Sequence, residues 1–189
     1  GPGDEKHVEA LLAAHADSSL FLRRNLAVTG FVDTGERYQG AWAGAFETGR
    51  LVAVAQHTRF SSVVVQAPVH AGAVTREAVR ASGRPVGGFI GPWAQALEAR
   101  AALGLADAPM RMESHEGLYA LPLDALVVPA LLTSGRGRCR RSSAADLDVL
   151  AAWRAGYRVE TNAETDGPKL RAASRQDVEE VGEGQEFGI

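Results

Sequence analysis

The chain has 189 residues, of which 46% are hydrophobic and 23% are charged, as expected for a folded protein with a substantial core. Its formal net charge of -3 disfavours a nucleic-acid-binding protein, since such proteins usually carry an excess of basic residues. The single cysteine, Cys139, excludes an internal disulfide and a zinc site built from thiolates. We therefore expect a cytoplasmic protein, and the lack of a long apolar run or a signal peptide argues against a membrane partner.

The first part of the chain predicts two amphipathic helices. Residues 5–15 carry apolar side chains at helical spacing. A second helix is expected to begin at a cap formed by Ser18 or Ser19 and to end in a left-handed cap at Gly30. The polar residues 33–39 then predict a loop.

The hydrophobic pattern next changes to that of a sheet. Two short apolar runs, residues 41–46 and 51–57, flank the turn residues 47–50 and predict a β-hairpin. Residues 62–66 include three consecutive valines and predict a buried strand. Pro68 has no N–H group to donate, so strand pairing is expected to fail near it.

A helix, a strand and another helix are predicted after this strand. Residues 74–81 have an amphipathic pattern that ends at Gly83. Residues 86–90 predict a glycine-rich strand, and Pro92 suits the first turn of a helix over residues 93–103.

The remaining residues predict two further strands, a linker and the beginning of a second unit. The two strands are expected at residues 110–113 and 117–121, and residues 124–137 are typical of a linker. Ser142 or Ser143 is expected to cap the first helix beyond the linker. The elements predicted after the linker are a strand, two helices and a final strand, at residues 138–141, 144–157, 168–180 and 186–189.

The order of these elements predicts an α/β (α+β) fold with a mixed sheet flanked by helices. The elements beyond the linker resemble the opening of a second domain of the same type, which is a repeat of architecture rather than of sequence. The first unit lacks an opening strand of its own. Two alternatives follow: residues 138–141 fill that sheet edge, or the open edge drives formation of a homodimer.

Four segments carry a resemblance to a known family. They are "FLRRNLAVTG", "YQGAWAGAFETGRLVAVAQH", "ASGRPVGGFIGPWAQALEARAALGLADAP" and "CRRSSAADLDVLAAWRAGYRVE". With the element order, they resemble the front half of a bacterial two-domain protein of the GNAT-type N-acetyltransferase superfamily, whose sheet is mixed and mostly antiparallel. The resemblance implies a degenerate GNAT-like domain at residues 4–123, a linker at 124–137 and a second, truncated GNAT-like domain at 138–189. It also implies transfer of an acetyl group from acetyl-CoA to an amine.

The resemblance places the family's cofactor loop directly after the strand at residues 62–66. The family's pattern there is Gln or Arg, two residues, Gly, one residue, then Gly or Ala, whereas this chain has "QAPVHAGA". Backbone N–H groups at a helix start suit a pyrophosphate. The candidate contacts to acetyl-CoA are therefore the backbone groups of His70, Ala71, Gly72 and Ala73. The alternative is that Pro68 and Gly72 only shape the connection from strand to helix.

Other motifs have both a functional and a structural interpretation. Residues 87–93 ("GGFIGPW") fit neither the Rossmann nor the Walker fingerprint, and they either border the approach of an acceptor or serve close backbone packing. Glu113 and His115 share one face of the predicted strand, either as a base and its orienting residue or as surface residues. The histidines show no ligand spacing, so no metal site is expected. No motif fixes a catalytic residue, and Tyr119 is assigned no role.

Cys139 lies within "RGRCRR", at residues 136–141. Beside arginines, an exposed thiol would favour its thiolate form, but on a strand we expect the thiol to point inward and the arginines to stay solvated. The large aromatic residues are expected in the core. They are Trp42, Trp93, Trp153, Phe21, Phe31, Phe46, Phe60 and Phe89.

Three functions are compatible with the sequence. The first is part of an acetyl-CoA-dependent N-acetyltransferase that acts on a small-molecule or peptide amine, with this chain either active by itself or holding only the non-catalytic half. The second is a non-catalytic GNAT-like module that binds a substrate or mediates dimerisation. The third, nucleic-acid binding through residues 136–141, is disfavoured because the chain is acidic and no aromatic residues are interleaved with the arginines.

Overall fold

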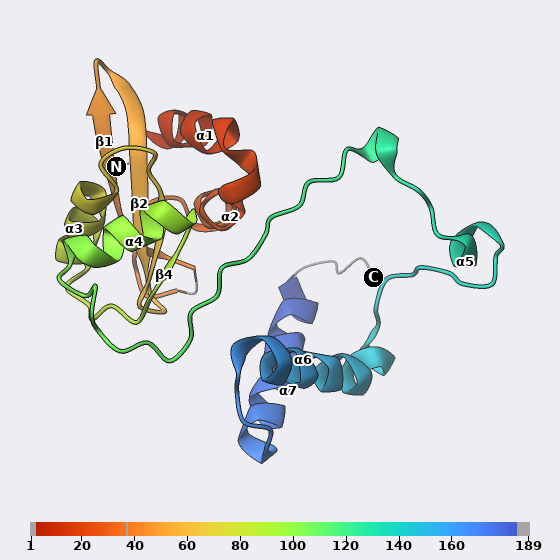
Figure 1. The fold of residues 1–189 in the computed structure, drawn as a ribbon. Coiled ribbons are helices and arrows are strands. Elements are labelled where there is room, and N and C mark those ends of the chain that lie inside the picture. Colours follow the sequence, from red (N-terminus) through yellow and green to blue (C-terminus); the bar gives the residue numbers. More distant parts are fainter. Residues whose placement is uncertain (1–2, 37, 185–189) are drawn as a thin grey trace. The chain divides into compact units, whose positions relative to one another are not determined.

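The computed structural model describes residues 3–36 and 38–184 of the chain, which divide into two compact units (Figure 1). The first unit extends to residue 110 and includes residues 115–120, and the second holds the other described residues. The described residues contain seven α-helices and one mixed sheet of four strands. The expected mixed α/β class is therefore confirmed.

The two helices predicted at the start are present as α1 (Glu5–Ala14) and α2 (Leu20–Thr29). Ser19, one of the two predicted serines, is the N-cap residue of α2, but its hydroxyl makes no capping hydrogen bond to the first amides of the helix. The hydroxyls of Ser18 and Ser19 instead donate to Oε1 of Gln66, at 2.8 and 3.3 Å. A buried glutamine needs hydrogen-bond partners, and this need outweighs the local capping preference.

The four strands are β1 (Gly40–Glu47), β2 (Arg50–Thr58), β3 (Ser62–Gln66) and β4 (Gly88–Ile90), and they lie in that order across the sheet. The predicted hairpin and the predicted valine-rich strand are confirmed, with β1 antiparallel to β2 and β2 antiparallel to β3. The last pair, β3 and β4, is parallel. Its partners are Ser62 with Gly88, Val63 with Phe89, and Val64 with Ile90.

Two further helices flank the short parallel strand. α3 (Ala71–Ser82) connects β3 to β4, and α4 (Trp93–Ala102) follows β4 directly after Pro92. α3 ends at Gly83, with a φ of 64°, and α2 ends at Gly30, with a φ of 58°. Glycine adopts positive φ values without a steric cost, so the predicted helix ends at Gly83 and Gly30 are confirmed. The left-handed cap predicted at Gly30 is wrong, because its ψ of -145° lies outside the left-handed helical region that Gly83 adopts.

The core of the first unit lies on both faces of the sheet, with α1 and α2 packed on one face and α3 on the other (Figure 1). The cluster beneath α1 and α2 contains Val8, Leu12, Leu22, Leu51, Val54 and Val64. The cluster beneath α3 contains Ala43, Ala53, Ala55, Val63, Val65, Ala67, Ala71, Val74 and Ala78. β3 contributes to both clusters because successive side chains of a strand point to opposite faces.

Three strands predicted outside this sheet are not formed among the described residues. They are residues 110–113, 117–121 and 138–141. For residues 110–113 and 117–121, the reason is that a strand requires a hydrogen-bonded neighbour, and the sheet in the described part of the chain ends at β1 and β4. Within residues 138–141, Arg141 forms an isolated β-bridge, which is too short to be a strand. Arg140 instead pairs with Asp146, at 2.6 Å. The strand predicted at residues 186–189 lies outside the described residues.

The second unit contains α5 (Ala130–Thr133), α6 (Leu147–Asn162) and α7 (Pro168–Gly184). The helices predicted near residues 144–157 and 168–180 are confirmed as α6 and α7. A capping box between Ser143 and Asp146 opens the turn that leads into α6, as the sequence predicted for a serine at this position. No helix in the described parts of either unit is long and apolar enough to span a membrane.

We expect the substitution Gly40→Ala to lower the free energy of unfolding by about 1–3 kcal/mol, the usual cost of overpacking. A methyl group at this position would lie 2.8 Å from Cα of Thr58 and would also meet the carbonyl oxygen of His57. The matched control is Gly88→Ala, whose methyl group would meet nothing closer than Ser62 Oγ, at 3.9 Å. Urea unfolding followed by circular dichroism measures both variants, and equal midpoints would contradict the prediction.

Candidate functional site

The predicted cofactor loop lies where β3 ends and α3 begins. His70 immediately precedes α3 and has left-handed backbone angles, with φ 59° and ψ 22°. Ala71 and Gly72 are buried in the first turn of the helix. The loop therefore has the placement that the sequence predicted, at the positive end of a helix dipole.

Two of the backbone N–H groups of this loop are already used within the protein. The N–H of Gly72 donates to Glu98 Oε1 at 2.9 Å, and the N–H of Ala73 donates to the carbonyl oxygen of His70 at 3.0 Å. At the end of β3, the N–H of Ala67 donates to Gln95 Oε1 at 2.6 Å. Two side chains of α4 thus occupy the space where an anion would meet these amides.

A second carboxylate lies at the same end of α3. Glu47 Oε1 is 2.6 Å from Nε2 of His70. Glu47 comes from the end of β1 and Glu98 from α4, so two acidic side chains from different elements meet this loop. Negative charge near the helix start disfavours a phosphate group there.

The structure also gives Gly72 a packing role. A Cβ atom at Gly72 would lie 2.8 Å from Cβ of Ala102 in α4, closer than methyl groups approach in proteins. The glycine therefore permits α3 and α4 to pack closely. This geometry favours the alternative interpretation, in which Gly72 shapes a strand-to-helix connection, while acetyl-CoA binding by residues 70–73 stays a prediction.

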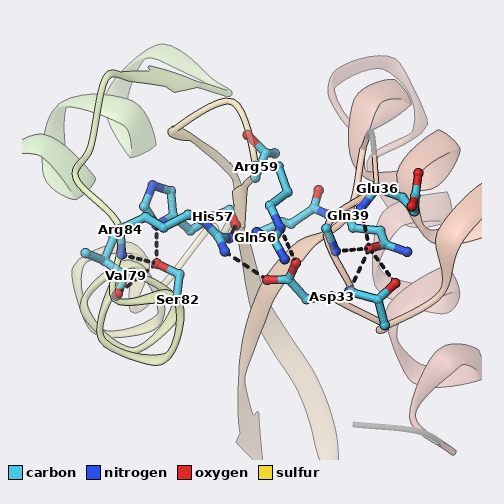
Figure 2. A network of polar contacts seen from close by, with 12 residues as sticks. Asp33, Glu36, Gln39, Gln56, His57, Arg59, Val79, Ser82 and Arg84 are labelled. Carbon is cyan, nitrogen blue, oxygen red and sulfur yellow. Dashed lines mark hydrogen bonds and ion pairs between the residues drawn. The ribbon is translucent and has the colours of Figure 1, made fainter.

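A network of charged and polar side chains lies at the other end of α3 (Figure 2). Asp33 accepts hydrogen bonds from Arg59 Nε at 2.6 Å and from Arg84 Nη1 at 3.0 Å. Arg84 Nη2 also donates to the carbonyl oxygen of His57 at 2.9 Å. The imidazole Nδ1 of His57 is 2.6 Å from Oγ of Ser82, the last residue of α3.

Buried amides extend the network toward α2 (Figure 2). Gln39 Oε1 accepts from the backbone N–H groups of Thr34, Gly35 and Glu36, at 2.7, 3.0 and 2.9 Å. Gln56 lies beyond it in β2, and its Oε1 accepts from Nδ2 of Asn25 in α2 at 2.7 Å. The bonds to Gln39 close the loop before β1 on itself, and the bond to Gln56 joins α2 to β2.

The network changes the ionisation of two of its members. Burial lowers the pKa of His57 below its usual value, and the positive charge of Arg84 lowers it further. Burial raises the pKa of Asp33, but the hydrogen bonds from Arg84 and Arg59 outweigh this effect and lower the pKa overall. At neutral pH the network therefore holds a neutral imidazole and a carboxylate bound by two guanidinium groups.

This arrangement lacks the geometry of a nucleophilic site. The carboxylate of Asp33 is bound by the two arginines, while the imidazole of His57 is bound to Ser82. The side chain of His57 is fully buried, so a substrate does not reach it. We interpret the network as a structural link that joins the loop before β1 to β2 and to the end of α3. The sequence did not predict this network because its residues are spread along the chain from 33 to 84. The one local sign of it was His57, a polar residue within the apolar pattern of β2.

Residues 87–93 form β4 and the first residue of α4. A Cβ atom at Gly91 would lie 2.5 Å from the carbonyl oxygen of Val65, so this segment is a place of close backbone packing. The indole ring of Trp93 stacks on the imidazole of His115, with centroids 4.5 Å apart. Glu113 and His115 are both exposed and lie outside any strand, as does Tyr119, which is 97% exposed.

The expectation that Cys139 points inward was wrong, because the thiol is exposed. Without the predicted strand there is no inward face for it. The prediction of aromatic core residues was also wrong in part. Of the eight predicted residues, Phe31, Trp42 and Phe89 pack against the two core clusters and Trp93 is half-buried, whereas Phe21, Phe46, Phe60 and Trp153 are exposed.

Comparison of the chain with models of protein families, with curated proteins and with solved structures found no match. The described residues also contain no group of three or more histidine, cysteine, aspartate or glutamate side chains that could hold a metal ion. Any functional assignment therefore depends on the fold and on the loop at the start of α3.

We expect the stability of the chain to fall as the pH drops below about 6.5, the ordinary histidine pKa. The lowered pKa of native His57 means that the unfolded chain takes up the proton more readily, so acid favours unfolding. The slope from this residue is at most about 1.4 kcal/mol per pH unit. Urea unfolding at several pH values measures it, and the variant His57→Asn serves as the control. The same pH slope in both proteins would contradict the prediction.

Proposed function

We propose that this chain is part of an acetyl-CoA-dependent N-acetyltransferase of the GNAT superfamily, which transfers an acetyl group to an amine of a small molecule or peptide. The observation that carries the proposal is the topology of the first unit. Two helices precede an antiparallel hairpin, and the third strand pairs in parallel with β4 through α3. This order supports the resemblance that the sequence shows to that superfamily.

The side chains around α3 fit the cofactor poorly. In the resembled fold, acetyl-CoA lies against the amides at the start of the helix after the central strand, but here Glu98 binds the N–H of Gly72. Glu47 adds a second carboxylate beside His70. We therefore derive no catalytic step through acetyl-CoA for this unit and assign no catalytic residue.

The same observation favours a second candidate function, a non-catalytic GNAT-like module. A unit that keeps the framework while acidic side chains occupy the cofactor end is suited to binding a substrate or to pairing with another domain. This function requires the sheet and its flanking helices, which the described residues provide. It does not require unoccupied N–H groups at the start of α3.

The start of α3 is tested by titration calorimetry with acetyl-CoA. We expect the wild-type chain to bind acetyl-CoA weakly, and the variant Glu98→Ala to bind it at least about tenfold more tightly, a change of about 1.4 kcal/mol. Removal of this carboxylate frees the N–H of Gly72 and abolishes a charge that repels phosphate. The matched control is Glu77→Ala, which removes one negative charge from an exposed position within α3.

The titration tests whether the start of α3 is a GNAT-type cofactor end that Glu98 blocks, which both candidates allow, and an acetyl-transfer assay then separates them. Tighter binding by Glu98→Ala alone supports a GNAT-type cofactor end that Glu98 blocks. Equal binding by both variants and the wild type contradicts the acetyltransferase proposal for this unit and leaves the module. Acetyl transfer by the wild-type chain to a panel of amines, measured as thiol release from acetyl-CoA, would contradict the module.

A further inference from the structure

A groove with a volume of about 960 Å³ runs between α1 and α2 in the first unit. The two helices lie next to each other on one face of the sheet (Figure 1). The groove is lined mainly by small and apolar side chains, with charged residues among them. Its residues are Glu5, Lys6, Glu9, Ala10, Ala13, Leu20, Arg23, Arg24, Leu26 and Ala27.

The helix α2 is apolar on two opposite sides. Its inner side buries Leu22 against the sheet. Its exposed surface carries Leu20, which lines the groove, and Phe21 and Val28, which lie outside the groove; the three residues are 64%, 61% and 56% exposed. A helix that is apolar on both sides is usually covered on both, and adjoining exposed apolar side chains commonly mark a protein–protein contact.

The charges along the groove are divided between its two sides. On the α1 side lie Glu5 and Glu9, with Lys6 between them, and on the α2 side lie Arg23 and Arg24. Glu9 and Arg23 already meet across the groove, at 2.6 Å, and both are partly exposed. A carboxylate and a guanidinium group each have further hydrogen-bonding positions beyond one such pair.

A twofold axis that runs along the groove, parallel to it, places the acidic α1 side of one chain opposite the basic α2 side of the other. In such an isologous arrangement, each contact occurs twice, so one complementary pair of charges is used two times. The small side chains of Ala10, Ala13 and Ala27 leave room for the apolar side chains of a second chain. The two sides of the groove are thus complementary in charge to their own twofold copy.

We propose that the face formed by α1 and α2 is the interface of a homodimer, with a second copy of this chain as its occupant. The interface does not depend on acetyl transfer, so the experiments below test it independently of the proposed function.

The edges of the sheet are less suited to this role. β4 offers only three residues, and the pairing of β1 with β2 is irregular, with a register shift between Ala45 and Phe46. Short edge strands and local irregularities such as bulges both hinder pairing between sheets. The open-edge homodimer considered from the sequence is therefore replaced here by a helical interface.

The first experiment is analytical ultracentrifugation of the full chain over a range of concentrations. We expect a species of twice the chain mass of 20.0 kDa that dissociates on dilution. The variant Leu20→Ser should raise the dissociation constant at least about tenfold, within the range of a buried interface residue. The matched control, Leu118→Ser, changes a leucine that is 68% exposed and lies outside the groove. A wild-type chain that is monomeric at every concentration overturns the proposal.

The second experiment exchanges the charges across the groove. We expect Glu9→Arg and Arg23→Glu each to weaken the homodimer at least about tenfold, because like charges then face each other at both twofold contacts. A mixture of the two variants should form heterodimers, since opposite charges face each other again. The double variant that carries both changes should form homodimers.

Recovery of the dimer in the mixture shows that both variants are folded and that the two sides of the groove face each other between chains. Circular dichroism of each variant provides a separate check of folding. Single variants that dimerise like the wild type, or a mixture without heterodimers, overturn the proposal. In the first case the dimer uses another face of the chain.

Discussion

The first unit depends on the burial of both faces of β3. Val64 packs beneath α1 and α2, whereas Val63 and Val65 pack beneath α3. A strand buried on both faces must have its backbone groups paired within the sheet, and β3 achieves this with an antiparallel neighbour on one side and a parallel neighbour on the other. The parallel neighbour requires a crossover, which α3 supplies. The start of α3 is thereby fixed beside the end of β3, where the candidate cofactor loop lies.

Polar side chains between the layers then determine how the loops close. Gln66 and Gln56 are fully buried, and serine and asparagine side chains from the region of α2 bond to them. On the other face, the fully buried His57 is bound by Ser82 at the end of α3. Buried polar groups are costly when left unpaired, so these bonds favour one arrangement of the helices over others that would bury similar apolar area.

The sequence predicted the place of the candidate loop but not its surroundings. Gly72 follows the valine strand at the expected distance, and the residues near it are visible in the sequence. Glu98 is a residue of a later helix, and nothing in its neighbourhood along the chain marks it as a partner of Gly72. The packing of α3 against α4 brings Glu98 next to Gly72, and this carboxylate makes the candidate site acidic. The network of Asp33, Arg84 and His57 was not predicted for the same reason, because its residues come from segments that are far apart in the sequence.

The sequence by itself determined the helices, the hairpin and the valine-rich strand of the first unit, because helical spacing, turn residues and β-branched runs act between near neighbours. Residues 117–121 have a similar local pattern but form no strand, since a strand exists only where another strand pairs with it, and residues 138–141 contribute only an isolated bridge at Arg141. Tertiary structure alone decided this pairing, the exposure of Cys139 and the contact of Glu98 with Gly72. Each depends on which distant segments meet, and local patterns carry no information about that.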